Sequence, residues 1–290
     1  MRFLAVAGAI VALAVSAPAF AQGKSQQHKN PPAPPSRSDL AAAPAGIATP
    51  TSVAATPTPF AAMDDASLLE PGSVSIAMSV VRWQGADVSE VDVPVVDAAI
   101  GVTPRVHLTA TVPRVLGGTD EFGAVGGVGT SYFSAKIAAL ADPRRGIKVS
   151  VAPTIEVLGH GVVQPAADGE HRTHFGLPVS VELDRGPARL YGGGGYFTRG
   201  VWFTGAGAGA RVGGKVFVST GLSVSWRTSD DATPLADRDR KELTVSASYA
   251  LTPQIGVYGA VARTITTLDE NGAGTSLVGG VSFFYAPPRR

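Results

Sequence analysis

The sequence comprises 290 residues without cysteine, and its 24 Lys and Arg residues nearly balance 23 Asp and Glu residues, for a formal net charge of +1. The missing cysteine excludes a disulfide scaffold and a lipid anchor on an N-terminal cysteine, while the near-neutral charge provides no basic surface for nucleic acid. Glycine is abundant (35 residues), charged residues make up only 16%, and no stretch favours a helix, which is typical of an all-β protein.

The first 21 residues have the organisation of a secretory signal peptide. Arg2 supplies a positive charge, residues 3–17 are apolar, and Ala19-Phe20-Ala21 places small residues before the expected cleavage site. This pattern predicts export and the removal of residues 1–21. No later run reaches the roughly 18 apolar residues that would indicate a membrane-spanning helix.

A proline- and alanine-rich segment, 22–68, follows the signal peptide. It contains PPAPPSR at 31–37 and further prolines at positions 44, 50, 57 and 59. Such a composition cannot bury a core and favours an extended or disordered arm. This arm is either an unstructured leader, which we favour, or a tether within the cell envelope. The folded domain is expected to span 69–290.

Extended segments without helical periodicity follow one another from Ser73 onward. A tilted membrane strand needs about nine to eleven residues to cross the hydrocarbon layer, whereas strands of globular proteins average about five or six. Their length therefore favours a membrane barrel. Twelve strands are expected, at 73–84, 88–101, 105–115, 128–141, 146–158, 174–184, 188–197, 200–211, 215–227, 241–251, 254–264 and 275–285.

The connections between these strands alternate in length. Barrels of the bacterial outer membrane combine short periplasmic turns with longer external loops in this way, and a soluble sandwich has no reason to do so. The short connections are 102–104, 142–145, 185–187, 212–214 and 252–253, built from Pro and Gly turn residues. The others are mostly longer and polar, at 116–127, 159–173, 229–240 and 268–274, with 84–87 and 198–199 as short exceptions.

Apolar and polar residues alternate along the strands. In 241–251, Leu243 and Val245 share one face, while Glu242 and Thr244 share the other. A soluble sandwich would alternate too, but the apolar faces carry mainly medium-sized aliphatic residues, with too few central aromatics for a two-sheet core. The aromatics lie at strand ends, as in the interfacial girdles of membrane barrels. The expected girdle residues are Trp83, Trp202 and Trp226 beside the longer loops, and Tyr249 and Tyr285 toward the short turns.

These patterns predict an all-β fold, a transmembrane antiparallel up-and-down β-barrel of about 12 strands of the outer-membrane type, with its apolar faces in lipid. The polar faces would then line a lumen narrower than that of open porins. Their mixed charges would form either a plugging salt-bridge network or a charged constriction that selects small solutes, and their balanced signs argue against strong ion selectivity. The lumen-facing candidates are Glu90, Asp92, Arg105, His107, Lys136, Lys148, Glu156, Glu182, Arg189, Arg211, Arg227 and Glu242.

Several motifs carry a family resemblance. Glu70-Pro71-Gly72-Ser73 opens the first strand, VPVVDAAIGVTPRVHLTATVPRV at 93–115 contains two strands and a short turn, and KVSVAPTIEVLGHG at 148–161 belongs to the next hairpin. In these stretches the chain resembles bacterial outer-membrane transporters associated with the meta-pathway of phenol degradation. The resemblance implies a barrel that passes small, often aromatic, molecules. The last strand, SLVGGVSFFYA at 275–285, resembles the terminal signal read by the barrel-assembly machinery.

Other motifs are weak evidence for chemistry. GARVGGKV at 209–216 has a phosphate-loop spacing, but Val216 stands where Ser or Thr is needed and a strand follows. His160, His171, His174 and Glu170 lack the regular spacing of a metal site. We therefore expect no catalytic residues, no metal and no cofactor.

The sequence thus favours an outer-membrane channel or transporter for small molecules, aromatic or hydrophobic ones among them. Its expected partners are outer-membrane lipid, the barrel-assembly machinery and the solute. One alternative is a closed structural barrel whose loops at 159–173 and 229–240 bind a partner. Another is a soluble periplasmic β protein.

Overall fold

The computed structural model describes residues 65–85, 89–119, 126–159, 172–198, 200–227, 240–267 and 274–287, all within one compact unit. These ranges hold no helix long and apolar enough to cross a membrane. Their strands, in chain order, are β1 (Val74–Gly85), β2 (Ser89–Thr103), β3 (Val106–Thr119), β4 (Gly127–Val128), β5 (Ser131–Asp142), β6 (Ile147–Val151), β7 (Thr154–Val157), β8 (Thr173–Gly176), β9 (Val179–Arg185), β10 (Ala188–Phe197), β11 (Val201–Val212), β12 (Val216–Arg227), β13 (Arg240–Ala250), β14 (Ile255–Thr267) and β15 (Gly274–Tyr285).

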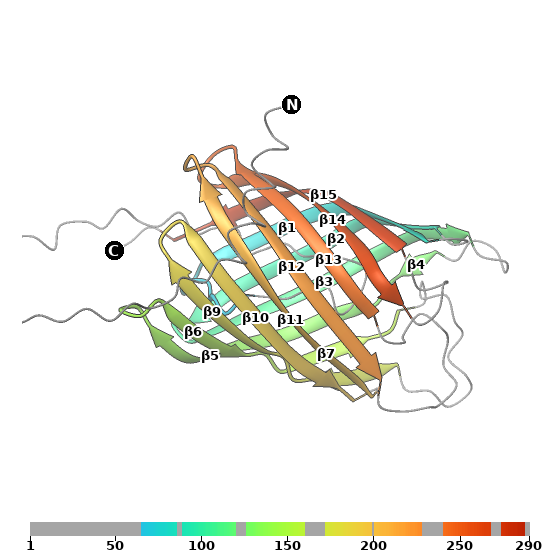
Figure 1. Ribbon diagram of the computed structural model, residues 1–290, viewed down its shortest axis with the longest axis horizontal. Coiled ribbons are helices and arrows are strands. Elements are labelled where there is room, and N and C mark those ends of the chain that lie inside the picture. Colours follow the sequence, from blue (N-terminus) through green and yellow to red (C-terminus); the bar gives the residue numbers. More distant parts are fainter. Residues whose placement is uncertain are drawn as a thin grey trace, which may run out of the picture. The chain divides into compact units, whose positions relative to one another are not determined.

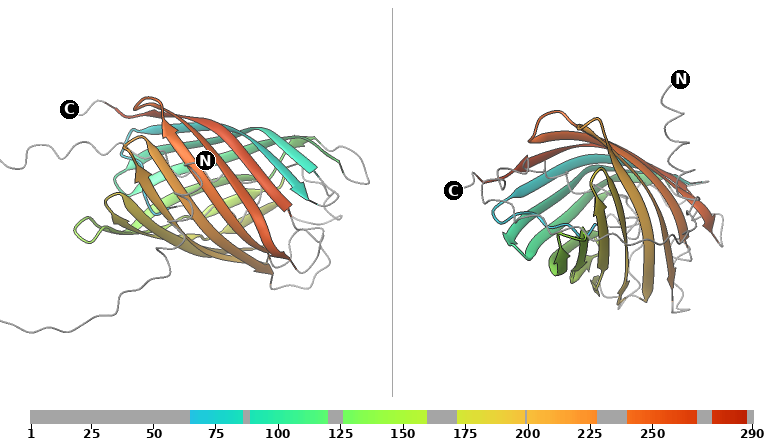
Figure 2. Two further views of the ribbon diagram at one scale, coloured as in Figure 1. Left: turned by 45° about the horizontal axis from the view of Figure 1, so that its top comes forward. Right: turned by 60° about the vertical axis from the view of Figure 1, so that its left-hand side comes forward.

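The strands form one closed antiparallel sheet. Neighbours in the chain pair with each other, except for β4 with β5, β6 with β7 and β8 with β9, and β1 closes the ring by pairing with β15 along its whole length, from Val74 opposite Tyr285 to Gly85 opposite Gly274. Figures 1 and 2 show the tilted strands curving around a common interior. Closure leaves no free sheet edge, which a membrane-spanning sheet requires because lipid offers no hydrogen-bond partners.

The fifteen segments make twelve barrel strands because three strands are interrupted. β6 and β7 both pair with β5 and are separated by Ala152 and Pro153, while β8 and β9 are separated by Leu177 and Pro178. Proline has no N–H group to donate to the ladder, so each proline breaks the strand locally. β4 and β5 form the third interrupted strand, with Gly129 and Thr130 between them instead of a proline. The predicted twelve-stranded barrel is confirmed, and the predicted strand ranges differ from the observed ones mainly at their ends.

The residues with phosphate-loop spacing form a hairpin turn between β11 and β12, so they are not a phosphate-binding loop. Gly213 and Gly214 both have positive φ angles, 62° and 78°, and they connect two paired strands. Positive φ angles at consecutive positions are typical of tight hairpin turns, and glycine adopts them most readily. We call the end of the barrel that carries this and the other short connections the short-turn end, and the opposite end the loop end.

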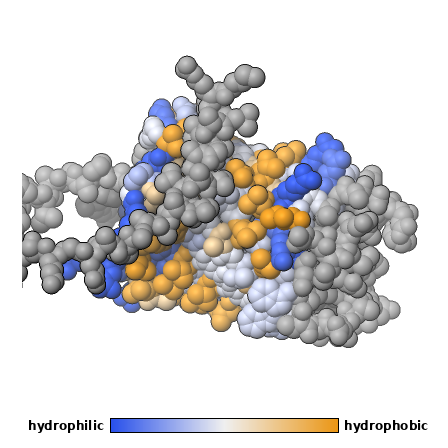
Figure 3. Space-filling model, viewed as in Figure 1, coloured by the Kyte–Doolittle hydropathy of each residue, from blue (hydrophilic) through white to orange (hydrophobic). Residues whose placement is uncertain are grey.

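Burial in the barrel is inverted relative to a soluble protein. Within the described ranges, the fully buried side chains are mostly polar or charged, whereas large apolar side chains cover the outside. Figure 3 shows apolar side chains spread over the barrel wall. Such a continuous apolar exterior suits lipid rather than water. It includes Ile76, Met78, Val80, Leu108, Ile137, Leu190, Leu222, Leu243, Val245, Val261 and Leu277.

Aromatic rings lie over glycines on the inner face. A Cβ atom at Gly207 would lie 2.6 Å from the ring of Tyr191, the residue opposite it on β10, and Gly280 would meet the ring of Tyr258 at 2.5 Å. Glycine leaves the space that each ring fills, and the ring shields the bare strand. The same arrangement recurs for Phe217 over Gly209, Phe197 over Gly176 and Trp83 over Gly274. These rings narrow the interior.

Candidate functional site

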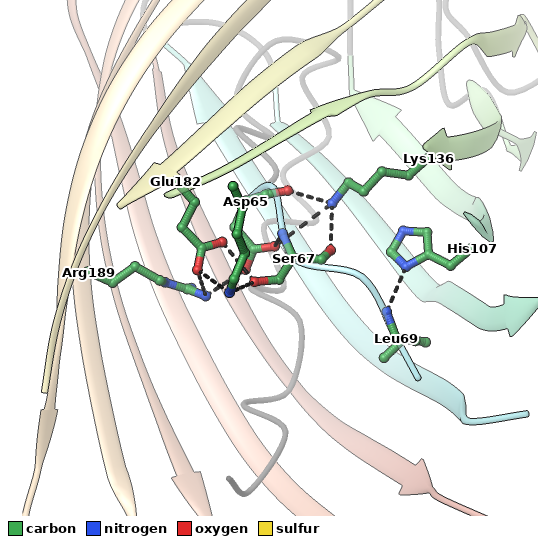
Figure 4. A network of polar contacts seen from close by, with 8 residues as sticks. Asp65, Ser67, Leu69, His107, Lys136, Glu182 and Arg189 are labelled. Carbon is green, nitrogen blue, oxygen red and sulfur yellow. Dashed lines mark hydrogen bonds and ion pairs between the residues drawn. The ribbon is translucent and has the colours of Figure 1, made fainter. Parts of the chain in front are cut away.

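The chain enters the barrel interior before it forms the first strand. Residues 65–69, which we call the inner segment, precede β1, and Asp65, Ala66 and Leu69 are buried. Gly72 N donates to Gly101 O at 2.8 Å, which fixes the segment's exit beside β2. Figure 4 shows the segment surrounded by side chains from several strands. Residues 65–68 were expected in the disordered arm, and the structure places them inside the barrel.

The carboxylate of Asp65 contacts two cations of the barrel wall. Arg189 Nη1 in β10 donates to Oδ2 at 2.7 Å, and Lys136 Nζ in β5 lies 3.8 Å from Oδ1. The Lys136 ammonium also donates to the carbonyl oxygens of Asp65 and Ser67, at 2.5 and 3.3 Å. Asp65 and Lys136 are 2% and 1% exposed, so these interactions are shielded from water and little weakened by its dielectric constant.

A second set of contacts surrounds the hydroxyl group of Ser67. Ser67 Oγ donates to Glu182 Oε2 at 2.8 Å and accepts from Lys148 Nζ at 2.9 Å. Lys148 also reaches Glu182 Oε1 at 3.0 Å. One hydroxyl group thus bridges an ion pair between partly buried Lys148 of β6 and buried Glu182 of β9, and the segment and the wall satisfy each other's polar groups.

His107 holds the far end of the inner segment. The backbone N–H of Leu69 donates to His107 Nδ1 at 3.2 Å, so Nδ1 must carry a lone pair and the ring proton lies on Nε2. The imidazole is fully buried, and within the described residues Nε2 has no hydrogen-bond partner. His107 therefore acts here as an acceptor for the backbone.

The inner segment follows one half of the barrel wall. In the strand order, β10 lies six barrel strands from β1 in either direction, counting each interrupted strand once, so it is the strand opposite β1. Among the described residues, its hydrogen bonds and ion pairs fall on one half of the ring, from β3 through β5, β6 and β9 to β10, and Gly72 just beyond it bonds to β2. The segment runs along this half of the wall, near the short-turn end.

Further buried polar side chains lie closer to the loop end. Tyr132 donates its hydroxyl proton to Glu156 Oε1 at 2.9 Å, and Arg240 Nη2 contacts Glu242 Oε2 at 2.8 Å. Asp92 is buried in β2, and its Oδ1 atom has no hydrogen-bond partner among the described residues. Charged groups therefore occur along the length of the interior.

The twelve residues predicted to face the lumen have different surroundings. Glu90 and Lys148 are partly buried, Arg105 and Arg211 are exposed at the short-turn end, and the side chain of Arg227 lies outside the described residues. The inner segment brings five of the twelve together, namely His107, Lys136, Lys148, Glu182 and Arg189. The buried members of the set are Asp92, His107, Lys136, Glu156, Glu182, Arg189 and Glu242.

Sequence reasoning missed Asp65 and Ser67, which complete this network. One signal was present, because prolines recur up to Pro59 and then stop until Pro71. A proline-free stretch ahead of the first strand is free to donate backbone hydrogen bonds, unlike the proline-rich arm. Of the loop residues considered for metal binding, His160, Glu170 and His171 lie outside the described residues, and His174 lies in β8 opposite Glu156.

Four of the five expected girdle residues have outward positions. Trp202 and Trp226 are opposite each other on β11 and β12, and Tyr249 and Tyr285 are exposed toward the short-turn end. Trp83 differs, because Ala77, Ser79 and Val81, whose side chains lie on the same face of β1 as that of Trp83, are buried. Its ring lies over Gly274, and its Nε1 atom is buried without a partner among the described residues. The strand therefore turns Trp83 inward.

Comparison with known proteins identifies the fold. No protein-family model and no curated protein matches the sequence. Among solved structures, an outer-membrane channel from Pseudomonas putida F1 matches with a TM-score of 0.58 and 13% identity, over 76% of this chain and 98% of that one. The NanC porin matches with a TM-score of 0.54 and 11% identity over 72% and 98%, and the KdgM porin with 0.51 and 8% over 71% and 98%. At such identities the likeness shows the outer-membrane barrel fold.

Proposed function

We propose that the protein resides in the bacterial outer membrane and forms a channel for small molecules. The observation that carries this proposal is the inverted burial of a closed barrel, apolar outside and charged within. An apolar exterior is stable in lipid, and an enclosed polar interior can provide a path for solutes across it. The likeness to solved outer-membrane porins and channels supports the same role.

Export would proceed through the signal peptide expected at residues 1–21, followed by insertion by the barrel-assembly machinery. The final strand, β15, supports this route because its exposed face ends in Phe283 and Tyr285. The resulting orientation would place the short-turn end in the periplasm and the loop end outside the cell.

The proposed solutes are small, and aromatic molecules are among them. The inner face carries aromatic rings, including Tyr191, Phe217 and Tyr258, beside charged groups such as Arg189. A planar solute can stack on such rings while its polar group meets a charged side chain. The resemblance to transporters of the phenol meta-pathway agrees with this solute class.

The inner segment favours a channel that is closed or narrow at rest. Its contacts with Lys136, Glu182 and Arg189 cross-link the inner surface of the wall. The same observation favours the second candidate function, a permanently closed structural barrel that acts through its external loops. In a solute channel the inner segment would move aside to open a path, whereas in a structural barrel it would stay in place.

Single-channel recording of the refolded protein in a planar bilayer tests the proposal. Discrete current steps that small aromatic acids reduce would support a solute channel. A bilayer that stays silent both without and with the aromatic acids, with insertion verified independently, would contradict it and favour the structural barrel. Heat-modifiable migration in detergent provides the matching test of the fold, since a soluble periplasmic protein would show no shift between unheated and boiled samples.

A further inference from the structure

Three cations interrupt the apolar exterior of the barrel near its loop end. Arg82 in β1, Lys241 in β13 and Arg263 in β14 are all exposed. Figure 3 shows hydrophilic side chains beside the apolar ones toward this end of the wall. Each cation lies two positions from an exposed apolar residue of its own strand, and this spacing keeps both side chains on the outer face. The three apolar residues are Val80, Leu243 and Val261.

The register of the sheet brings these cations together with two neutral polar side chains. Arg263 is paired with Thr275 of β15, and Thr275 is paired with Gln84 of β1. Neighbouring strands lie about 4.8 Å apart, so β14 and β1 are separated by only about 10 Å across the sheet. Lys241 lies on β13, which pairs with β14 on its other side. We call these five residues the outer polar patch: Arg82, Gln84, Lys241, Arg263 and Thr275.

The cations of the outer polar patch have no anionic partner on the barrel itself. Within the described part of the chain, no carboxylate forms an ion pair with Arg82, Lys241 or Arg263. Arg240, the neighbour of Lys241 along β13, differs because it pairs with Glu242 at 2.8 Å. An unpaired charge at the edge of the hydrocarbon layer is costly, and the long side chains of Lys and Arg lower this cost by reaching toward lipid headgroups. The headgroups are therefore the source of anions that these cations can reach.

Apolar side chains continue from the outer polar patch toward the middle of the barrel wall. Leu277 is opposite Arg82 and Leu243 is opposite Arg263, and both leucines are exposed. A molecule bound here would meet cations toward the loop end and an apolar surface beside them. A phosphorylated lipid has this distribution of groups, with its phosphate next to its acyl chains. Guanidinium groups bind phosphate oxygens with two parallel hydrogen bonds, which suits Arg82 and Arg263 to the charged part.

We propose that the outer polar patch binds the phosphate group of a lipid in the outer leaflet of the outer membrane. This proposal rests on the proposed location and orientation of the protein, which place the loop end outside the cell. A free phosphate ion offers the same charge, but it has no acyl chains to cover Leu243 and Leu277. The patch therefore selects for a lipid that carries phosphate.

Lipid binding to the full-length mature protein, refolded in an uncharged detergent, tests this site. Diphosphorylated lipid A is the probe, and dephosphorylated lipid A, which keeps the acyl chains, is the matched lipid. Native mass spectrometry is expected to show about tenfold or more tighter binding of the phosphorylated form. Inorganic phosphate is the free-ion arm of the test and should compete only weakly. Equal binding of the two lipids, or complete competition by inorganic phosphate, would overturn the proposal.

A variant that combines Arg82→Gln, Lys241→Gln and Arg263→Gln should lose the preference for the phosphorylated lipid. Its affinity for dephosphorylated lipid A should stay unchanged, because the apolar surface is intact. Heat-modifiable migration checks that the variant is folded. Should the triple variant fail to fold, Arg263→Gln alone is the second variant, and a several-fold weaker preference is expected of it.

The matched control removes three exposed cations from the short-turn end, so its net charge changes by the same amount. It combines Arg144→Gln, Arg145→Gln and Lys215→Gln. The control should keep the preference of the wild type, because these residues lie in or beside turns at the other end of the barrel. Loss of the preference in both variants would indicate general charge attraction and overturn the proposal, as would its retention in both.

Lipid binding in detergent does not require conduction, so the two proposals fail separately. Phosphate-dependent binding that needs the outer polar patch, in a barrel that stays silent in bilayers, would support the lipid site and contradict the channel. Conduction by a barrel that binds the two forms of lipid A equally would support the channel and overturn the lipid site.

Discussion

Arg189 and Asp65 form a 2.7 Å ion pair between positions 124 residues apart in the chain. Asp65 lies just ahead of β1, and Arg189 lies on β10, the strand opposite β1 in the ring. The pair therefore joins the beginning of the barrel to the far side of its wall. Any movement of the inner segment out of the interior must break this pair, which makes it the natural place to test for gating.

Asp65→Asn is expected to increase the open fraction of the channel. A hydrogen bond between charged groups contributes about 1.5–3 kcal/mol, so its weakening should shift a closed–open equilibrium about tenfold or more toward the open state. Single-channel recording of the variant and wild type measures the open probability. Asp142→Asn serves as the control, because its carboxylate pairs with exposed Arg145 at the short-turn end. Equal open probabilities in all three proteins would show that the pair does not hold the channel closed.

Gly207→Ala is expected to destabilise the barrel by about 1–3 kcal/mol, because overpacking displaces neighbouring atoms. The new Cβ would lie 2.6 Å from the ring of Tyr191 and 2.7 Å from the carbonyl oxygen of Thr220. The midpoint temperature of heat-modifiable migration measures the effect. Gly279→Ala is the control, since a Cβ there meets nothing within 4 Å. A similar loss in both variants would indicate that intrinsic strand propensity, not ring packing, is responsible.

The barrel itself could be predicted because its signals are local. Strand length, the alternation of residues such as Leu243 and Glu242, and the alternation of short and long connections all follow from neighbouring residues. The breaks at Pro153 and Pro178 were equally visible in the sequence but were absorbed into longer predicted strands. Their backbone carbonyls still accept hydrogen bonds from neighbouring strands, so the ladder continues past each break.

The interior site could be predicted only in part because it depends on contacts between distant residues. Alternation placed Lys136, Glu182 and Arg189 on polar faces, and all three are buried. It could not reveal that the inner segment contacts all three, because the one signal in the sequence, the absence of proline between Pro59 and Pro71, does not say where that segment lies. The prediction for Trp83 failed in a similar way. Its place at a strand end suggested a girdle residue, but it lies on the face of β1 that points into the barrel.

The positions of the three tryptophans lead to a spectroscopic prediction. Variants that each retain one tryptophan, refolded into vesicles with brominated acyl chains, should differ in fluorescence quenching, because bromine quenches only rings that contact the chains. We expect strong quenching for Trp202 and Trp226, which lie outward on β11 and β12. Trp83, whose ring lies over Gly274, should be quenched much less. Equal quenching of all three would place Trp83 in the girdle after all.

Val245→Arg is expected to weaken folding into a bilayer by about 2–4 kcal/mol, because the charge would lie near the membrane midplane. Val245 is at the centre of β13 and 53% exposed, so the same substitution in a soluble protein would cost little. Leu251→Arg is the matched control: Leu251 is also exposed but lies in the turn after β13, where the interfacial cost falls to about 0–1 kcal/mol. Equilibrium unfolding from vesicles by denaturant measures both. A small and equal effect at the two positions would mean that the apolar exterior does not face hydrocarbon, and the membrane orientation of the barrel would have to be abandoned.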